Sequence, residues 1–452
     1  MNSKLFGTDG IRTRAGKFPL NAPAIVAIGQ AIGERLGGTL LVGYDTRVSS
    51  PWILGLLKQG IGRTSAVVHD AGVIPTPGIA LLVKTEGYSG GIMISASHNP
   101  FEDNGVKVFA SDGTKLSDAA EVEIEHRVIA LLAESQSGVF EHRDEIPETT
   151  INGENLTDFP ERYLRRIETH FRSGQWLQGL RIVVDCANGA MSRIAPALLS
   201  RFGAKLHLIN ATPSGKNINA SCGAVHMESL IAEMTPGIAD FGVAFDGDGD
   251  RALFVSRKGR PIDGDAVLLL IARRLRPSKV VGTSMTNFAL ETILKKEGIG
   301  LTRVNVGDRF IFEEMQRHLN ASGTNGILGG EPSGHIIFSD FGLSGDGLLT
   351  ALKVAEAIVE TKSSLDDLCR DWIPSPHLLK GVRVEKKVPL EQLPEVQFKI
   401  SEIEEDLTGR GRIVVRYSGT EPLLRVMIES DDAARNEKWM EELTATIKKS
   451  LH

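Results

Sequence analysis

Cysteine is scarce in this sequence and forms no recognisable metal or disulfide pattern. The 452 residues contain three cysteines, and none of them stands in a C-x-x-C pair. Structural zinc sites and small disulfide frameworks need cysteines at short, regular spacings, so we expect neither kind of site. We interpret Cys186, Cys222 and Cys369 as buried or unreactive thiols.

The sequence also lacks a cluster of basic residues. It has 51 Lys and Arg against 57 Asp and Glu, which gives a formal net charge of −6. Proteins that bind nucleic acid or an anionic membrane surface usually carry a basic patch, so we expect neither partner. An anionic ligand would therefore have to be held by a few local arginines.

No segment is apolar over the thickness of a bilayer. The longest strongly apolar stretch, residues 266–272, ends at Arg273 and Arg274, whereas a membrane-spanning helix needs about 20 residues. The first ten residues contain Lys4 and Asp9 in place of the apolar core of a secretory signal. We therefore expect no membrane partner and a cytoplasmic location.

Length and composition point to several globular domains. Hydrophobic residues make up 41% of the chain and charged residues 24%, a balance typical of proteins that bury hydrophobic cores. Short apolar runs alternate with helical patterns, beginning with a strand at 39–43, a helix at 51–62 and a strand at 65–69. The same alternation returns twice, which predicts three successive α/β domains.

The last part of the chain follows a different pattern. Strand-like segments at 381–387, 413–416 and 424–429 precede a helical segment at 433–451, which predicts a C-terminal α+β domain. Polar and proline-containing stretches suggest the boundaries between domains. We expect domains at residues 1–155, 156–256, 257–374 and 375–452.

The most distinctive local motif alternates aspartate with glycine. Asp246, Asp248 and Asp250 are separated by single glycines and follow an apolar strand at 241–245. Glycine lets the backbone curl, so the three carboxylates can converge on one hard cation, for which Mg²⁺ is the natural candidate. The residues that follow do not supply the glycine and glutamate that an EF-hand loop requires, so an EF-hand is excluded. The remaining alternative is a solvated Asp-Gly turn.

A serine loop, residues 95–100, directly follows an apolar stretch. A serine on a tight Asn-Pro turn at the end of a strand is exposed enough to be a nucleophile or a phosphate carrier, and Ser97 is the candidate. The alternative is a polar turn without chemistry. The neighbouring His98 does not imply a Ser-His pair, because adjacent side chains diverge in an extended chain. Lys107, at the start of the next strand, could stabilise charge or transfer protons, although a lysine in that position more often faces solvent.

A third loop carries three polar groups between glycines. Glu331, Ser333 and His335 stand at alternate positions, where they could face one way and hydrogen-bond sugar hydroxyls. On its own this pattern is weak, and without the other three loops a structural loop would explain it better.

A fourth loop is suited to a phosphate group. Arg416 and Arg425 flank a Ser-Gly-Thr turn, and guanidinium groups together with turn amides bind phosphate oxygens well. The alternative is a β-hairpin with two surface arginines. Walker A and G-x-G-x-x-G spacings are absent, which removes the main support for a nucleotide cofactor.

In this order, the four loops closely resemble those of the α-D-phosphohexomutases. The resemblance runs from Phe6-Gly7-Thr8-Asp9-Gly10-Ile11-Arg12 to Arg425 and covers nearly the whole chain. It implies three α/β domains with mixed sheets and a fourth α+β domain around a central cleft. It also implies a phosphoserine, one Mg²⁺ per chain, and a sugar 1,6-bisphosphate that serves as intermediate and activator.

Within that family the chain is most similar to the bacterial phosphoglucosamine mutases. The segments that carry this similarity are 6–12, 185–190, 217–226 and 306–309. The similarity implies interconversion of glucosamine 6-phosphate and glucosamine 1-phosphate. Three positions depart from the usual family residues, and they are Thr13, Pro332 and Tyr417.

The resemblance also implies a role for each matching residue. Ser97 would carry the phosphoryl group and share Mg²⁺ with the metal ligands Asp246, Asp248 and Asp250. The implied catalytic residues are Ser97, Arg12, Lys107, Arg251 and His335. The implied substrate-binding residues are Glu331, Ser333, Asp308, Arg309, Arg416, Ser418, Gly419, Thr420 and Arg425. In chain order, the four domains would be the catalytic phosphoserine, metal-binding, sugar-binding and phosphate-binding domains.

Two other functions stay open. A phosphoglucomutase or phosphomannomutase would share every catalytic loop and differ only in sugar preference. A phosphosugar-binding protein without turnover is the non-enzyme alternative, and loss of the serine or of an aspartate would be its hallmark. In each case the expected partner is a phosphorylated hexosamine or hexose, and both a monomer and a homodimer are compatible with the sequence.

Overall fold

The computed structural model describes residues 5–7, 9–135, 158–322, 326–342, 344–418 and 422–451. The chain forms two compact units. The first comprises residues 1–283 and 304–369, and the second comprises residues 284–303 and 370–452. Among the described residues, no helix combines the length and the apolar composition that crossing a bilayer requires.

The first sheet of the first unit is mixed, with the strand order β1-β5-β4-β2-β3. Its strands are β1 (Ile11–Arg14), β2 (Thr39–Tyr44), β3 (Val67–Val73), β4 (Gly90–Ile94) and β5 (Asp103–Ala110). β2 pairs in parallel with β3 and β4, whereas β5 is antiparallel to β4 and β1. The serine loop therefore connects two neighbouring antiparallel strands, β4 and β5.

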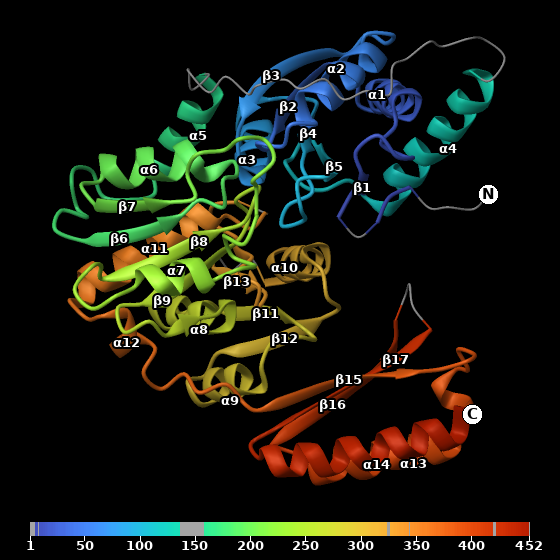
Figure 1. Cartoon of the computed structure of the whole chain (residues 1–452), viewed down its shortest axis with the longest axis vertical. Helices are drawn as coiled ribbons and strands as arrows, with labels where there is room; N and C mark the ends of the chain where they lie inside the picture. The colour runs from blue at the N-terminus through green and yellow to red at the C-terminus, as the bar shows by residue number, and fades with distance from the viewer. Residues whose placement is uncertain are drawn as a thin grey trace. The chain divides into compact units, whose positions relative to one another are not determined.

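Helices cover both faces of this sheet (Figure 1). They are α1 (Ala22–Leu36), α2 (Ser50–Ile61), α3 (Thr76–Glu86) and α4 (Asp118–Ser135). Val42 of β2 packs into one hydrophobic cluster with Ile53 of α2. On the other face α3 lies so close that a Cβ on Gly43 or Gly91 would come within 2.7 or 2.8 Å of Ile79. Glycine at these two positions allows the close packing of α3 on β2 and β4.

The second sheet is also mixed and has the order β10-β9-β8-β6-β7. Its strands are β6 (Arg181–Asp185), β7 (Lys205–Ile209), β8 (Phe241–Phe245), β9 (Ala252–Ser256) and β10 (Pro261–Ile262). The helices of this part are α5 (Asp158–Glu168), α6 (Met191–Arg201) and α7 (Glu228–Glu233). β8 is buried along its whole length and antiparallel to β9, so the Asp-Gly motif forms the connection between two paired strands.

The third sheet contains β11 (Lys279–Thr283), β13 (Ile327–Gly330) and β14 (Ile336–Phe338). β13 is parallel to β11 and antiparallel to β14, and the Glu331–His335 loop joins β13 to β14. The accompanying helices are α8 (Gly264–Leu275), α10 (Asp308–Ser322), α11 (Gly347–Thr361) and α12 (Leu365–Leu368). Asp263 and Asp346 cap α8 and α11 by accepting backbone N–H bonds, which satisfies donors that a helix start leaves free.

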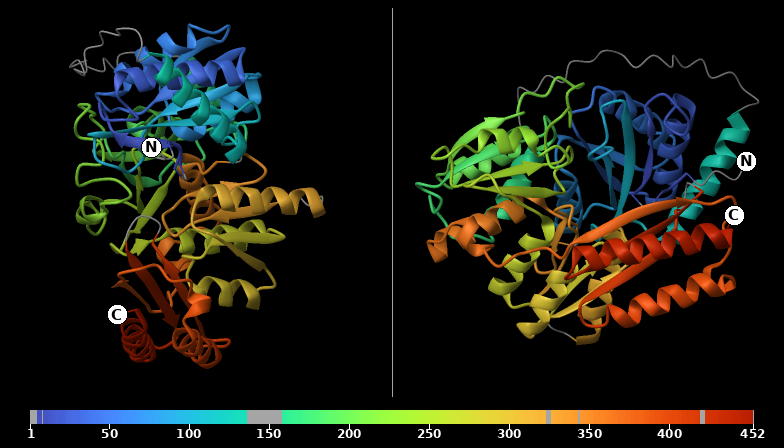
Figure 2. Two further views of the ribbon diagram at one scale, coloured as in Figure 1. Left: turned by 90° about the vertical axis from the view of Figure 1, so that its right-hand side faces the viewer. Right: turned by 60° about the horizontal axis from the view of Figure 1, so that its bottom comes forward.

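The second unit has an antiparallel sheet with the order β15-β17-β16. Its strands are β15 (His377–Arg383), β16 (Gly411–Tyr417) and β17 (Leu423–Ser430), and a 3₁₀ turn, η1, spans Leu390–Gln392. α13 (Pro394–Asp406) and α14 (Ala433–Leu451) lie side by side on one face of the sheet (Figure 2). α9 (Phe288–Lys296) and all but the last residue of β12 (Gly300–Val304) also belong to this unit.

The sheets confirm the expected fold class of three α/β domains with mixed sheets and a C-terminal domain that combines helices with an antiparallel sheet. One strand differs, because the segment expected at 381–387 is the strand His377–Arg383. Its pairing along β17, from Glu429 to Leu423, sets these limits. The domain boundaries and the central cleft stay predictions.

Candidate active site

Ser97 lies three residues beyond the end of β4 and is buried, with 1% of its surface exposed. Its Oγ donates a hydrogen bond to Asp246 Oδ2 at 2.7 Å. This burial corrects the expectation of an exposed serine. The Asp-Gly motif covers the serine loop so closely that a Cβ on Gly247 would come within 2.5 Å of the Ser97 carbonyl oxygen.

His98 lies closer to Ser97 than an extended chain would allow. The distance between Ser97 Oγ and His98 Nδ1 is 3.3 Å, because Ser97 has a φ of 51°, in the left-handed region, and the two side chains do not diverge. Burial and the positive charges of Arg251 and Arg12 lower the pKa of His98 to about 4. Its imidazole is therefore neutral near pH 7.

The three aspartates of the motif form one buried cluster. An oxygen of each carboxylate lies within 4.8 Å of an oxygen of the other two. Asp248 Oδ1 and Asp250 Oδ1 are buried and, among the described residues, have no hydrogen-bond partner. Burial, together with the charges of Asp250 and Asp248, raises the pKa of Asp246 well above its usual range. Buried carboxylate oxygens without donors fit a divalent cation, whose charge would relieve this repulsion.

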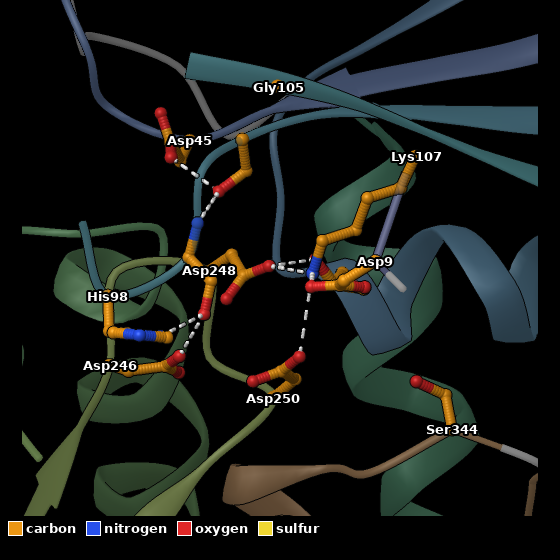
Figure 3. A network of polar contacts seen from close by, with 12 residues as sticks. Asp9, Asp45, His98, Gly105, Lys107, Asp246, Asp248, Asp250 and Ser344 are labelled. Atoms are coloured by element: carbon orange, nitrogen blue, oxygen red, sulfur yellow. Dashed lines mark hydrogen bonds and ion pairs between the residues drawn. The ribbon is translucent and has the colours of Figure 1, made fainter. Parts of the chain in front are cut away.

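Lys107 extends from β5 into the same cluster (Figure 3). Its Nζ lies 2.9 Å from Asp248 Oδ2, 3.6 Å from Asp250 Oδ2 and 3.3 Å from Asp9 Oδ2. The side chain is buried, so the alternative of a solvent-facing lysine is wrong. Burial alone would lower the pKa of Lys107, but the three carboxylates outweigh it and raise the pKa above its usual value. The ammonium group thus keeps its positive charge.

Asp9 connects this cluster to further cations, a role that the sequence did not reveal. Its carboxylate forms ion pairs with Arg12 and Lys115 as well as with Lys107. Against the effect of burial, which would raise it, these three cations hold the pKa of Asp9 well below its usual range. Lys115 also pairs with Asp308 at 2.6 Å. In the sequence, the feature that could have pointed to Asp9 is its place in the Phe6–Arg12 segment, which carries part of the family resemblance.

His335 approaches the aspartates from the third sheet. Its Nδ1 lies 3.7 Å from Asp250 Oδ2 and its Nε2 3.8 Å from Asp308 Oδ2, while the Gly345 N–H donates to Nε2 at 3.1 Å. Burial disfavours the charged imidazole, but the hydrogen bond and charge of Asp250 outweigh it and raise the pKa of His335. Arg251 forms a backbone bridge with His335, and its guanidinium lies 3.8 Å from Asp250 Oδ1.

The other residues expected to bind the sugar differ in whether they have hydrogen-bond or ion-pair partners. Glu331 Oε1 accepts the Gly307 N–H at 3.3 Å, and Ser333 Oγ is buried without a partner among the described residues. Arg309 pairs with Asp118 of α4. Lys115, Asp308 and Arg309 also line a cavity of about 530 Å³, a volume typical of small-molecule sites. The structure thus brings Ser97, Lys107, Arg251 and His335 to the aspartate cluster, whereas among the described residues it shows no contact of Glu331, Ser333 or Arg309 with the three aspartates.

The expected phosphate loop belongs to the second unit. Arg416 of β16 stands directly opposite Arg425 of β17, and Ser418 is buried, with its N–H bound to the Leu423 carbonyl at 2.8 Å. Gly419 and Thr420 lie outside the described residues. Like charges directly opposite each other in a sheet repel, so this pair suits an anion.

Thr76 was also missed by sequence reasoning. This first residue of α3 donates from Oγ1 to Asp248 Oδ2 at 2.5 Å and from its N–H to the Asp248 carbonyl at 2.9 Å. It orients the carboxylate from a position 172 residues away in the chain. No local pattern marks it.

The chain matches the models of four domains of the phosphoglucomutase/phosphomannomutase family. Alpha/beta/alpha domain I matches at residues 3–133, domain II at 161–259, domain III at 263–375 and the C-terminal domain at 379–446.

Similar full-length proteins carry a more specific description. The phosphoglucosamine mutase of Koribacter versatilis (strain Ellin345) is 42% identical over 468 residues, which cover 99% of this chain and 97% of that protein. The phosphoglucosamine mutase of Deinococcus radiodurans is 42% identical over 436 residues, covering 95% and 94%.

Solved structures share the fold at lower identity. A phosphoglucomutase/phosphomannomutase family protein from Burkholderia thailandensis superimposes with a TM-score of 0.79 at 23% identity, covering 100% of this chain and 98% of that one. Aspergillus fumigatus N-acetylphosphoglucosamine mutase, in complex with GlcNAc-6P and magnesium, gives a TM-score of 0.59 at 17% identity, covering 99% and 96%. The family models and the full-length relatives together confirm the resemblance, and the chain belongs to the phosphoglucomutase/phosphomannomutase family, the α-D-phosphohexomutases.

Proposed function

We propose that this chain interconverts glucosamine 6-phosphate and glucosamine 1-phosphate through a phosphoserine at Ser97 and a sugar 1,6-bisphosphate. The observation that carries the proposal is the 2.7 Å hydrogen bond from Ser97 Oγ to Asp246 Oδ2. It sets a hydroxyl group beside a buried cluster of three carboxylates, and phosphoryl transfer needs its nucleophile next to a cation.

The reaction consists of two transfers at the same oxygen. In the first, the bond between phosphorus and Ser97 Oγ breaks, a bond from phosphorus to O1 of glucosamine 6-phosphate forms, and the proton of O1 passes to Ser97 Oγ. The bisphosphate then turns within the site. In the second transfer the bond between phosphorus and O6 breaks, phosphorus bonds to Ser97 Oγ, and the proton of Oγ passes to O6. Burial of Ser97 supports this sequence, because water must be kept from the phosphoserine.

Asp246, Asp248, Asp250 and an oxygen of phosphorylated Ser97 would hold Mg²⁺. The fit rests on the oxygens Asp248 Oδ1 and Asp250 Oδ1, which are buried and lack a donor among the described residues. When bound, the ion would supply positive charge that neutralises the transferring phosphoryl group.

Three groups are placed to stabilise charge or move protons. Lys107 and Arg12 suit charge stabilisation, because both are cations held near the cluster by carboxylates. His335 suits proton transfer, since its Nδ1 faces Asp250 and an imidazole titrates nearer to neutral pH than a lysine or an arginine does. Arg251 adds a further positive charge beside Asp250.

The sugar would be recognised by Glu331, Ser333, Asp308 and Arg309, of which only Asp308 and Arg309 line the 530 Å³ cavity. Arg416, Ser418, Gly419, Thr420 and Arg425 would hold the phosphate that is not reacting. Fixing that phosphate orients the sugar for in-line transfer in either direction. In this proposal the four domains keep the roles of serine, metal, sugar and phosphate binding.

The choice of glucosamine rests on relatives rather than on the site. Full-length proteins about 40% identical to this chain are described as phosphoglucosamine mutases, whereas the catalytic loops would equally serve glucose or mannose phosphates. The test is a coupled assay of the three sugar 6-phosphates, with Mg²⁺ and a catalytic amount of glucose 1,6-bisphosphate. We expect the highest kcat/KM for glucosamine 6-phosphate. A higher value for glucose or mannose would overturn the sugar assignment.

A further inference from the structure

Two buried side chains from different sheets bind the same two carbonyl oxygens of the serine loop. Arg47 follows β2 and Asn219 lies between β7 and α7. Arg47 Nη2 donates to the carbonyls of Ser97 and Asn99 at 2.9 and 2.8 Å. Asn219 Nδ2 donates to the same two oxygens at 2.9 and 3.0 Å. Since both neighbours of this amide group are acceptors, its NH₂ must face them.

Arg47 is itself held in one position. Its side chain has no exposed surface, and its Nε donates to Asp45 Oδ2 at 2.9 Å. Its Nη1 donates to the carbonyls of Asp103, at 3.0 Å, and of Pro100. One guanidinium group therefore spans the whole turn from Ser97 to Asp103. A lysine in its place could not, because an ammonium group is a compact point charge without the planar fork.

The amide end of Ser97 is held through the same carboxylate. The Ser97 N–H donates to Ser95 Oγ at 2.8 Å, and Ser95 Oγ donates to Asp45 Oδ2 at 2.6 Å. The N–H and the carbonyl of Ser97 are thus fixed by Ser95 and Arg47, and both of these residues also donate hydrogen bonds to Asp45. This matters because Ser97 has a φ of 51°, a left-handed conformation that serine adopts only when its surroundings hold it there.

The aspartate loop packs directly on these contacts. A Cβ on Gly247 would come within 2.5 Å of the Ser97 carbonyl oxygen and 2.8 Å of Asn219 Nδ2. Any movement of the Ser97 carbonyl would therefore change the position of Ser97 Oγ relative to Asp246.

We propose that Arg47 and Asn219 form a carbonyl clamp and are positioning residues for phosphoryl transfer at Ser97. This inference rests on the proposed function, and it concerns the position of the nucleophile rather than the sugar. Both half-reactions use the same Oγ, so a misplaced serine slows transfer in both directions and leaves sugar binding largely intact.

The test compares Asn219→Ala with Asn219→Asp. Each variant removes both N–H donors of the Asn219 side chain, and Asn219→Asp also places a negative charge against the two carbonyl oxygens. We expect kcat to fall by about tenfold to a hundredfold in Asn219→Ala and further in Asn219→Asp, with KM for glucosamine 6-phosphate within about threefold of wild type. In single-turnover experiments with glucose 1,6-bisphosphate, the rate of Ser97 phosphorylation should fall by the same factor as kcat.

Asn217→Ala is the matched control, because Asn217 lies in the same loop and its side chain bonds Ser214 and Thr212. It should retain wild-type kcat. Arg47→Lys keeps the buried charge but removes the fork, so it should behave as Asn219→Ala does if it folds. Wild-type kcat and phosphorylation rate in Asn219→Ala, or an equal loss in Asn217→Ala, would overturn the clamp. A wild-type protein that turns over none of the three sugar phosphates would instead overturn the proposed function.

Discussion

Ser97 Oγ and Asp246 Oδ2 lie 2.7 Å apart although 149 residues separate them in the chain. Ser97 lies three residues beyond β4 of the first sheet, and Asp246 directly follows β8 of the second sheet. The hydrogen bond therefore joins the serine loop of one α/β domain to the carboxylate cluster of the next. The proposed phosphoryl transfer therefore depends on how these two domains pack within the first unit.

Removing one carboxylate should weaken metal binding. In Asp248→Asn the cluster loses a negative charge and a ligand, while Asp246 and Asp250 remain. We expect Mg²⁺ affinity to fall about tenfold or more, measured as the Mg²⁺ dependence of turnover and by calorimetry. Asp240→Asn, just before β8 and outside the cluster, is the control. Equal midpoints for Asp248→Asn and wild type would contradict the metal site.

Asp9 should matter for catalysis although it is not one of the proposed metal ligands. It is the shared counter-ion of Arg12, Lys107 and Lys115. Asp9→Asn removes the negative charge that the three cations share, although Lys107 keeps its ion pairs with Asp248 and Asp250 and Lys115 keeps its pair with Asp308. We expect kcat to fall by about tenfold, in line with the loss of one charged hydrogen-bonding partner. Asp112→Asn, whose side chain caps a turn at Thr114, is the control. If both variants match wild type in steady-state kinetics, Asp9 has only a structural role.

Arg416→Ala should harm both directions of the reaction. Arg416 stands opposite Arg425 on the sheet of the second unit, and in the proposed mechanism both half-reactions need the non-reacting phosphate held. Losing one charged donor typically costs about 1.5 to 3 kcal/mol, or about tenfold to a hundredfold in kcat/KM. Lys448→Ala, in the last turn of α14, serves as the control. Wild-type kcat/KM for glucosamine 6-phosphate in Arg416→Ala would mean that the phosphate is bound elsewhere.

The cap of α11 should make stability depend on pH. Asp346 is fully buried, and burial raises its pKa from 3.8 to about 6, against the hydrogen bonds that it accepts. Between these pH values the unfolded chain has released the proton and the folded protein has not, so the free energy of unfolding falls as pH rises. Asp346→Asn has no such titration. Relative to wild type, its free energy of unfolding should rise by about 2 to 3 kcal/mol from pH 4 to pH 7.

The measurement is urea unfolding of both proteins at pH 4, 5, 6 and 7. The comparison cancels the titration of all other groups, which the two proteins share. A difference that stays constant over this range would show that Asp346 titrates alike in the folded and unfolded chains.

The sequence predicted those site residues that lie together in one short segment directly after a buried strand. The aspartates follow β8 and the serine loop follows β4, so local pattern was enough to find both. Ser97 was expected to be exposed, and its burial came from a loop of another domain. His98 lies close to Ser97 Oγ because the backbone at Ser97 is left-handed. The sequence pattern does not predict that conformation.

Other contributors were hidden because their role exists only in tertiary contact. Thr76 and Asn219 act on residues 172 and 122 positions away. Thr76 stands in no charged or glycine-rich motif, and the 217–226 segment that contains Asn219 gave no indication of its contacts. Arg47 belongs to an ordinary turn in the sequence, yet it is among the largest fully buried side chains of the chain. Such groups are recognised from burial and hydrogen bonds, which depend on the packing of the sheets.

The central claim is that Ser97 carries the phosphoryl group. The most direct test is intact-protein mass spectrometry after incubation with Mg²⁺ and glucose 1,6-bisphosphate, followed by peptide mapping. Wild type should gain one phosphoryl group, located on Ser97. Ser97→Ala should gain none and lose nearly all turnover while keeping its circular dichroism spectrum. Equal labelling of Ser97→Ala, or a phosphoryl group mapped to another residue of the wild type, would contradict the account.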